Sequence, residues 1–152
     1  MKKINYWSDE KEKIDVSCKL PSCLAKDYFV PSINKILTKI KPDHQDFVPK
    51  YSDSSCADIV ANTPEGLVLA QKTSALIDCG FFIEKPIGYK IRIITNINLA
   101  QKGFYLEDHC VETGRVEITA FNNGQESIFI NHKQVIGQMY IEPVYLFEWE
   151  TS

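Results

Sequence analysis

Residues 76–89 decide the fold, and they read Leu-Ile-Asp-Cys-Gly-Phe-Phe-Ile-Glu-Lys-Pro-Ile-Gly-Tyr. The Phe-Phe-Ile run at 81–83 has the aromatic and β-branched bias of a half-buried strand. Gly80 interrupts the apolar run, which predicts a bulge or a close backbone approach. Pro-Ile-Gly at 86–88 predicts a turn, because proline presets φ and glycine supplies the freedom that proline lacks. The stretch therefore predicts a hairpin whose second strand covers residues 89–94.

The chain from residue 47 onward predicts further short strands separated by turns. Residues 115–121 alternate apolar and polar side chains, and Asn-Asn-Gly at 122–124 is a strong turn signal. The other strand-like segments are residues 58–61, 67–70, 104–106, 127–130, 135–141 and 144–149. Many short strands with regular turns are typical of a β-sandwich or β-barrel, so we predict an all-β fold.

One amphipathic helix is predicted before these strands. Ser32 is a good N-cap, apolar side chains follow at the spacing of one helix face, and Pro42 ends the pattern. The apolar residues are Ile33, Ile36, Leu37 and Ile40. A helix of this length is not stable alone, so we expect it to dock on the chain's own β core or on a partner.

We therefore divide the chain into three parts: an N-terminal arm with the helix (1–46), a β domain (47–143) and an aromatic C-terminal tail (144–152). The tail is predicted to be a strand with Tyr145, Phe147 and Trp149 on one face and apolar side chains on the other. A terminal strand of this kind needs cover on both faces. We expect a neighbouring subunit to supply that cover.

The composition excludes several classes of function. The 152 residues are 44% hydrophobic and 24% charged, as in a soluble domain with one sizeable core. A net charge of −3 gives no electrostatic attraction to nucleic acid or to an anionic membrane, and no apolar run could span a bilayer. The amino terminus lacks the apolar core of a secretory signal. The five cysteines are scattered and the histidines isolated, so we expect a cytoplasmic protein without disulfides or a metal site.

The order of these segments resembles the trimeric dUTPase family, jelly-roll β proteins that split dUTP into dUMP and pyrophosphate. The resemblance covers about residues 48–143. Residues 69–89 resemble a long scaffold run that ends Ile-Pro-x-Gly-Tyr in the family. Asp58 falls on the aspartate of the first motif, and residues 136–138 resemble the fourth motif, which ends Ile-Ala-Gln. The resemblance implies a jelly-roll β-barrel and a homotrimer.

The residues that carry the family's chemistry are not matched. The second motif reads Pro-Arg-Ser-Gly-Leu-Ala in the family, and here Asn96 stands for the arginine and Ile97 for the serine. Residues 115–118 resemble the end of the third motif, but its catalytic aspartate falls on Val111. The C-terminal tail has no glycine and no basic residue, whereas the family's fifth motif has both.

The resemblance therefore implies a catalytically degenerate dUTPase-like protein without catalytic residues or a cofactor. It would serve as a trimeric structural or interaction module, with a protein partner bound through the N-terminal arm and helix or through the C-terminal tail. Genes of this kind are common in phages, so a virion is a reasonable setting beside the host cytoplasm. The vestigial nucleotide-site candidates are Asp58, Asn96, Arg115 and Gln138.

Structural roles remain open for several of these residues, since Asp58 could be a cap or turn residue, Gln138 a bridge between subunits and Arg115 an ion-pair partner. Two other functions also remain. One is an active, divergent, Mg²⁺-dependent dUTP diphosphatase in which Glu112 or Asp108 is a relocated base. The other is a nucleotide-binding sensor without hydrolysis.

Overall fold

The computed structural model describes residues 36–52 and 56–151, and its β domain is one compact unit, Leu37–Ser152. The elements in chain order are β1 (Lys39–Pro42), the 3₁₀ turn η1 (Gln45–Phe47), β2 (Lys50–Tyr51), β3 (Ala57–Val60), β4 (Leu67–Leu69), β5 (Ser74–Glu84), β6 (Tyr89–Thr95), α1 (Ile97–Ala100), β7 (Phe104–Leu106), β8 (His109–Val111), β9 (Gly114–Asn122), β10 (Ile128–Ile130) and β11 (Val135–Pro143). The predicted all-β fold is confirmed. No helix of the described residues has the length and hydrophobicity needed to cross a membrane.

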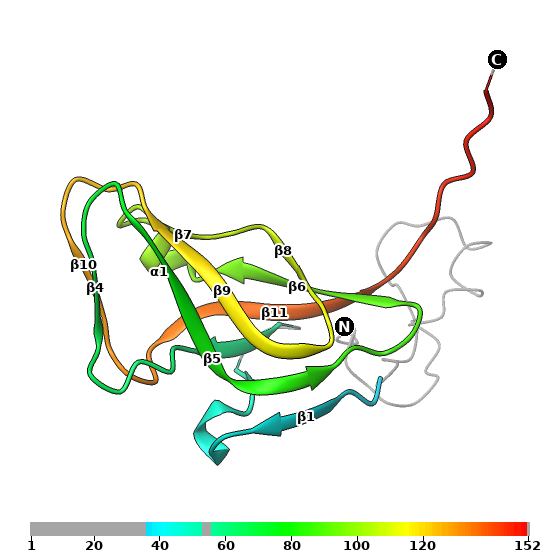
Figure 1. Ribbon diagram of the computed structural model, residues 1–152, viewed down its shortest axis with the longest axis horizontal. Coiled ribbons are helices and arrows are strands. Elements are labelled where there is room, and N and C mark those ends of the chain that lie inside the picture. The colour runs from blue at the N-terminus through cyan, green and yellow to red at the C-terminus, as the bar shows by residue number, and fades with distance from the viewer. Residues whose placement is uncertain (1–35, 53–55, 152) are drawn as a thin grey trace, which may run out of the picture. The chain divides into compact units, whose positions relative to one another are not determined.

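The described residues of the domain form two larger antiparallel sheets and one two-stranded ribbon. The four-stranded sheet has the order β1-β5-β9-β7, the five-stranded sheet has the order β2-β3-β11-β6-β8, and β4 pairs with β10 in a separate ribbon (Figure 1). One apolar cluster draws residues from both larger sheets, including Phe81 of β5, Ile59 of β3 and Ile93 of β6. Period-two alternation puts every second side chain of strands such as β3 and β7 into this core. The result is a jelly-roll-like sandwich of the predicted class.

The predicted hairpin at residues 76–89 is wrong in its pairing. Both strands exist and the turn between them is present, with the Tyr89 amide donating to the Pro86 carbonyl at 3.3 Å. However, β5 lies in the four-stranded sheet and β6 lies in the five-stranded sheet. Since each strand has a buried apolar face, the chain buries both by crossing from one sheet to the other, so that the two faces meet across the core.

The bulge predicted at Gly80 is confirmed. The register between β5 and β9 shifts between Asp78 and Phe82, which is a bulge, and Gly80 has φ +77°. The ring of Phe47 occupies the space that a Cβ at position 80 would need. A glycine is therefore required here by the backbone conformation and by a neighbouring side chain.

The predicted amphipathic helix is wrong where the structure can test it. Lys39–Pro42 is a strand, β1, that pairs with β5 from Lys39 opposite Glu84 to Pro42 opposite Phe81, and residues 36–38 are not helical. The start of the predicted helix, residues 32–35, lies outside the described residues. Lys-Ile-Lys-Pro also alternates exposed and half-buried side chains with period two, and the edge of β5 supplies the strand's partners. β1 thus belongs to the four-stranded sheet, and the division of the chain at residues 46 and 47 stays a prediction.

The α-helix of the described residues is elsewhere, at α1, in the segment that resembles the second motif. At the other end of the domain, the predicted terminal strand is also wrong, because residues 144–151 form no strand. Val144 still donates its amide to the Gly88 carbonyl at 3.0 Å. The large apolar side chains that follow are 81% to 89% exposed, and they are Tyr145, Leu146, Phe147 and Trp149.

Candidate functional site

Three of the vestigial nucleotide-site candidates come from adjacent strands of the five-stranded sheet. Gln138 on β11 lies opposite Asp58 on β3, and its Nε2 donates to the Asp58 Oδ1 at 2.9 Å. Asn96 follows β6 on the other side of β11, and its amide donates to the Ile136 carbonyl at 3.0 Å. All three side chains are half-buried. The structure therefore brings Asp58, Asn96 and Gln138 to one end of this sheet.

The polar atoms of this group are largely used within the chain. The Asn96 side-chain oxygen caps α1 by accepting from the amides of Asn98 at 3.0 Å and Leu99 at 3.4 Å. Ile97, at the position of the family's serine, is 68% exposed and has no hydrogen-bonding side chain. Asp58 accepts from Gln138 as described above. A cationic side chain also lies beside this group, that of Lys50 on β2, which is exposed and pairs opposite Asp58 in the sheet.

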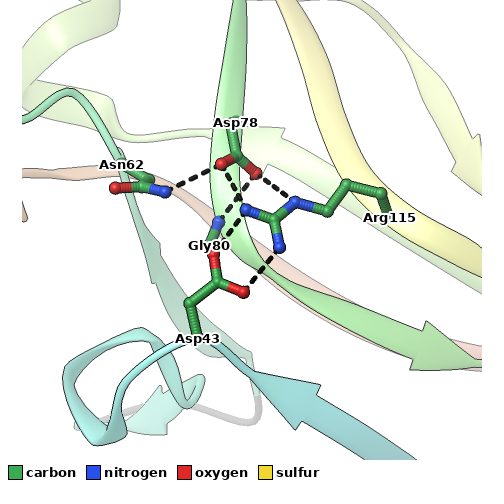
Figure 2. Close-up of polar contacts among 5 residues, drawn as sticks. All are labelled: Asp43, Asn62, Asp78, Gly80 and Arg115. Atoms are coloured by element: carbon green, nitrogen blue, oxygen red, sulfur yellow. Dashed lines mark hydrogen bonds and ion pairs between the residues drawn. The ribbon is translucent and has the colours of Figure 1, made fainter.

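The fourth candidate, Arg115, lies apart from these three, on β9 of the four-stranded sheet. Figure 2 shows its guanidinium between two carboxylates. Its Nε donates to the Asp78 Oδ1 at 2.8 Å and its Nη2 to the Asp78 Oδ2 at 2.5 Å. The same side chain donates to Asp43, from Nη1 at 2.7 Å and from Nη2 at 2.5 Å. It also lies over the ring of Phe82, 5.1 Å from the centroid.

Asp78 is the centre of this network, which we call the Arg115 clasp and define as Asp43, Asn62, Asp78, Gly80 and Arg115. Asn62 donates to the Asp78 Oδ2 at 2.8 Å and the Gly80 amide to the Oδ1 at 3.0 Å (Figure 2). Asp43 in turn donates its own amide to the Gly80 carbonyl at 2.9 Å. The clasp thus connects β5, β9, the end of β3 and the end of β1.

The charges of the clasp stabilise one another. Burial raises the pKa of Asp78, but the hydrogen bonds from Arg115, Gly80 and Asn62 outweigh it, so the pKa lies below its ordinary value. The hydrogen bond from Arg115 also lowers the pKa of Asp43, and the two carboxylates raise the pKa of Arg115. Both acids are therefore ionised at neutral pH, and Arg115 acts as the predicted ion-pair partner, with Asp43 and Asp78 as its partners.

The two relocated-base candidates lie on the segment before β9. Lys85 holds Glu112 at 2.5 Å, and Arg92 holds Asp108. The carboxylate side chains are 70% and 77% exposed. The hydrogen bond that Arg92 donates to the Asp108 carboxylate raises the pKa of Arg92. Each candidate base is thus a solvent-facing member of an ion pair.

Magnesium is the metal that an active nucleotide site of this fold would use, with ligands from carboxylates and from the phosphates. The described residues contain no group of three or more His, Cys, Asp or Glu side chains that could hold a metal ion. Near Gln138 the structure offers one carboxylate, Asp58, which is already hydrogen-bonded. These residues do not by themselves form a magnesium site.

Sequence reasoning missed the partners of Arg115. Asp78 lies within residues 76–89, two positions before Gly80. A charged residue inside an apolar strand indicates that an oppositely charged partner lies nearby, so this position could have been found from the sequence. Asp43 gave no such signal, because it follows what was predicted to be a helix. Cys79, between Asp78 and Gly80, is buried, and that burial raises the pKa of its thiol to about 12, so it is an inert core residue.

The architecture defines an antiparallel jelly-roll β protein. No protein-family model matches the chain. The structure is similar to that of a dUTPase from phage phi11 of S. aureus, with a TM-score of 0.66 and 15% identity over 77% of this chain and 97% of that chain. It is also similar to the dUTPase of Staphylococcus bacteriophage 80alpha, with a TM-score of 0.67 and 16% identity over 78% of this chain and 97% of that chain.

The chain has a dUTPase-like fold, and the predicted resemblance is confirmed at that level. The match spans nearly the whole of each phage protein, so the β domain contains the complete scaffold. The phi11 structure concerns coordination of a structural Mg(II) ion, and an 80alpha structure was solved with dUpNHpp. Because a fold hosts different functions, the activity of this chain must be argued from its own residues.

Proposed function

We propose that this protein is a non-catalytic dUTPase-fold protein that acts as a homotrimeric structural or interaction module. The observation that carries this proposal is the state of the arginines. The sequence has two, and both are paired with aspartates of the same chain, Arg115 with Asp78 and Asp43, and Arg92 with Asp108. Arginine is the usual bidentate ligand of phosphate, so a triphosphate would have to displace an existing ion pair.

The second-motif positions support the same conclusion. Asn96 is committed to capping α1, and Ile97 presents an apolar side chain to solvent where a donor would be needed. Removal of one oriented donor to a developing oxyanion typically reduces a rate by about 10² to 10³. Loss of several such donors would leave negligible hydrolysis.

The C-terminal tail supports an interaction role. Four large apolar side chains between residues 145 and 149 are almost fully exposed in the single chain. Burying one such side chain contributes roughly 1.5–3 kcal/mol, so a surface of this kind favours a bound subunit or partner. Two glutamates, Glu148 and Glu150, would repel a triphosphate.

The phage relatives give a setting. The 80alpha structures describe phage dUTPases that control the transfer of virulence genes by a G protein-like mechanism. A regulatory role therefore exists on this fold in a phage protein. We place this chain in the same setting, in the host cytoplasm or in a virion, with a protein partner at its tail or N-terminal arm.

The alternative is an active dUTP diphosphatase, and one observation favours it. The scaffold match covers 97% of two phage dUTPases, and two exposed carboxylates, Asp108 and Glu112, lie on the segment where a base would be required. A nucleotide sensor without hydrolysis would share the same scaffold. Both alternatives require a nucleotide to bind.

An assay of pyrophosphate release tests the proposal. The full-length protein is incubated with dUTP and Mg²⁺, and we expect release at the background rate. Turnover that disappears in Glu112→Ala or Asp108→Ala would establish the diphosphatase instead. The matched control is Glu65→Ala, which removes an exposed glutamate from a turn of the β domain.

Two physical measurements complete the test. Light scattering should give the mass of a trimer. A ligand that binds only the folded state raises the melting temperature. If the protein binds no nucleotide, as proposed, dUTP and dUMP should leave its melting temperature unchanged. A saturable shift without turnover would favour the sensor, and a monomeric mass would contradict the assembly.

A further inference from the structure

Residues 39–47, which we call the strap, lie near the N-terminal end of the compact unit that begins at Leu37. The strap contains β1 and η1, and β1 is an edge strand paired with β5 on one side. Pro42, one of the four residues of β1, has no amide hydrogen to donate. Its side chains alternate between exposed and half-buried, and Phe47 is the residue of the strap that is buried. The strap is thus a lightly buried segment on a well-buried sheet.

Side chains at its C-terminal half hold the strap in place. Asp43 accepts two hydrogen bonds from Arg115, and Asp46 pairs with Lys133 at 2.6 Å. Lys39 pairs with Glu84 at 3.3 Å at the other end. The ring of Phe47 fills the space above Gly80 and meets the His132 ring edge-on, with centroids 5.7 Å apart. Phe47 and the Asp43–Arg115 pair are therefore the two main anchors.

Release of the strap would leave no half-buried charge of the Arg115 clasp without a partner. Arg115 would keep its two hydrogen bonds to Asp78, and Asp78 would keep those from Asn62 and Gly80 (Figure 2). Asp43, already 43% exposed, would pass into water. A buried charge that loses its only partner is strongly unfavourable, but here the half-buried pair stays intact in both states. The Asp43–Arg115 contact can therefore be lost while the Asp78–Arg115 contact remains.

We propose that the strap is a detachable segment that opens while the other strands of both sheets stay folded, with the Asp43 and Phe47 side chains holding it closed. Opening uncovers the edge of β5 and the space above Gly80, which the strap refills when it closes. Because only residues 37 and 38 separate the strap from Ile36, a partner that binds the N-terminal arm would act on this equilibrium through the backbone. This regulation rests on the proposed interaction function.

Hydrogen exchange of the full-length protein at neutral pH tests the inference. We expect amides of residues 39–47 to exchange at least about 100-fold faster than those of β9, because local opening is cheaper than global unfolding. Asp43→Asn should accelerate strap exchange about tenfold further and leave β9 unchanged, since it removes a charge-assisted hydrogen bond. Phe47→Ala should have a larger effect in the same peptides.

The matched control is Asp108→Asn, which removes an exposed ion pair on another part of the domain and should leave strap exchange unchanged. Exchange of the strap in step with β9, or equal acceleration of both by Asp43→Asn, would overturn the inference. The dUTP assay reports separately on the proposed function: turnover with independent strap opening would refute that function and leave the strap standing.

Discussion

The two arginines of the chain are similarly exposed, 25% for Arg115 and 30% for Arg92, and differ in the carboxylates that they contact. Arg115 makes four hydrogen bonds to two aspartates from different elements, and its side chain and that of Asp78 are each 25% exposed. Arg92 pairs with one aspartate, Asp108, which is 77% exposed. Both are arginine–aspartate ion pairs. Only Arg115 contacts carboxylates from two separate elements, one of which, Asp78, is half-buried.

The difference teaches that burial and connectivity decide what an ion pair does. An exposed pair gains little, because water screens the charges and two long side chains must be ordered. A half-buried bidentate pair is sensitive to the loss of either partner, since the other charge then lacks compensation. Arg115 is therefore expected to be a structural residue, and Arg92 a surface one.

The largest expected effect is that of Arg115→Ala. It leaves the half-buried Asp78 carboxylate without its cation and should lower the free energy of unfolding by about 3 kcal/mol, measured by urea denaturation. Arg92→Ala is the matched control and should cause a much smaller loss. Equal losses in the two variants would break the comparison.

The next effect concerns the bulge that positions Asp78. Gly80→Ala places a Cβ in a residue with φ +77° and against the Phe47 ring, and should cost about 2 kcal/mol. Gly88→Ala is the control, because Gly88 has φ +81° but nothing within 4 Å, so it should cost about 1 kcal/mol. Urea midpoints of both variants separate the steric contribution from the conformational one.

Acid should weaken the Arg115 clasp. The pKa values of Asp43 and Asp78 are lowered in the folded protein, so their contribution is present above the ordinary value of 3.8 and is lost as pH falls below it. Urea midpoints between pH 7 and pH 3 should therefore fall more steeply in the natural protein than in Arg115→Ala. Parallel curves would show that the clasp is not the source.

The smallest effect is expected from Asp108→Asn. Its carboxylate is largely exposed and has one partner, so the urea midpoint should stay within error of the natural protein. A clear loss of stability would show that the segment before β9 is more tightly held than its exposure indicates.

Much of the fold was predictable from local pattern. The alternation at residues 115–121, the apolar segment at 135–141 and the turn at 86–88 all correspond to observed features, as does the bulge at Gly80. These features depend on the period of the side chains and on backbone freedom, which are properties of neighbouring residues. The dUTPase-like scaffold followed from their order.

The errors came from pairing and from ambiguous periodicity. Lys39–Pro42 satisfies a helical and a strand pattern equally, and the free edge of β5 decided in favour of the strand. The α1 turn was missed because four residues are too few for a helical pattern, although Asn96 is a good cap. Of the site candidates, the sequence named Arg115 but could not name Asp43, since 72 residues separate the two.

The sequence by itself determined most of the strands between β3 and β11 and where the backbone must bulge. Only the tertiary structure decided that the strands of residues 76–94 belong to different sheets and that Arg115 is enclosed by Asp43 and Asp78. The physical reason is the distance along the sequence over which each property is determined. Strand propensity and hydrogen-bonding capacity belong to single residues, whereas the partner of a strand edge or of a charge is chosen by whatever the folded chain brings beside it.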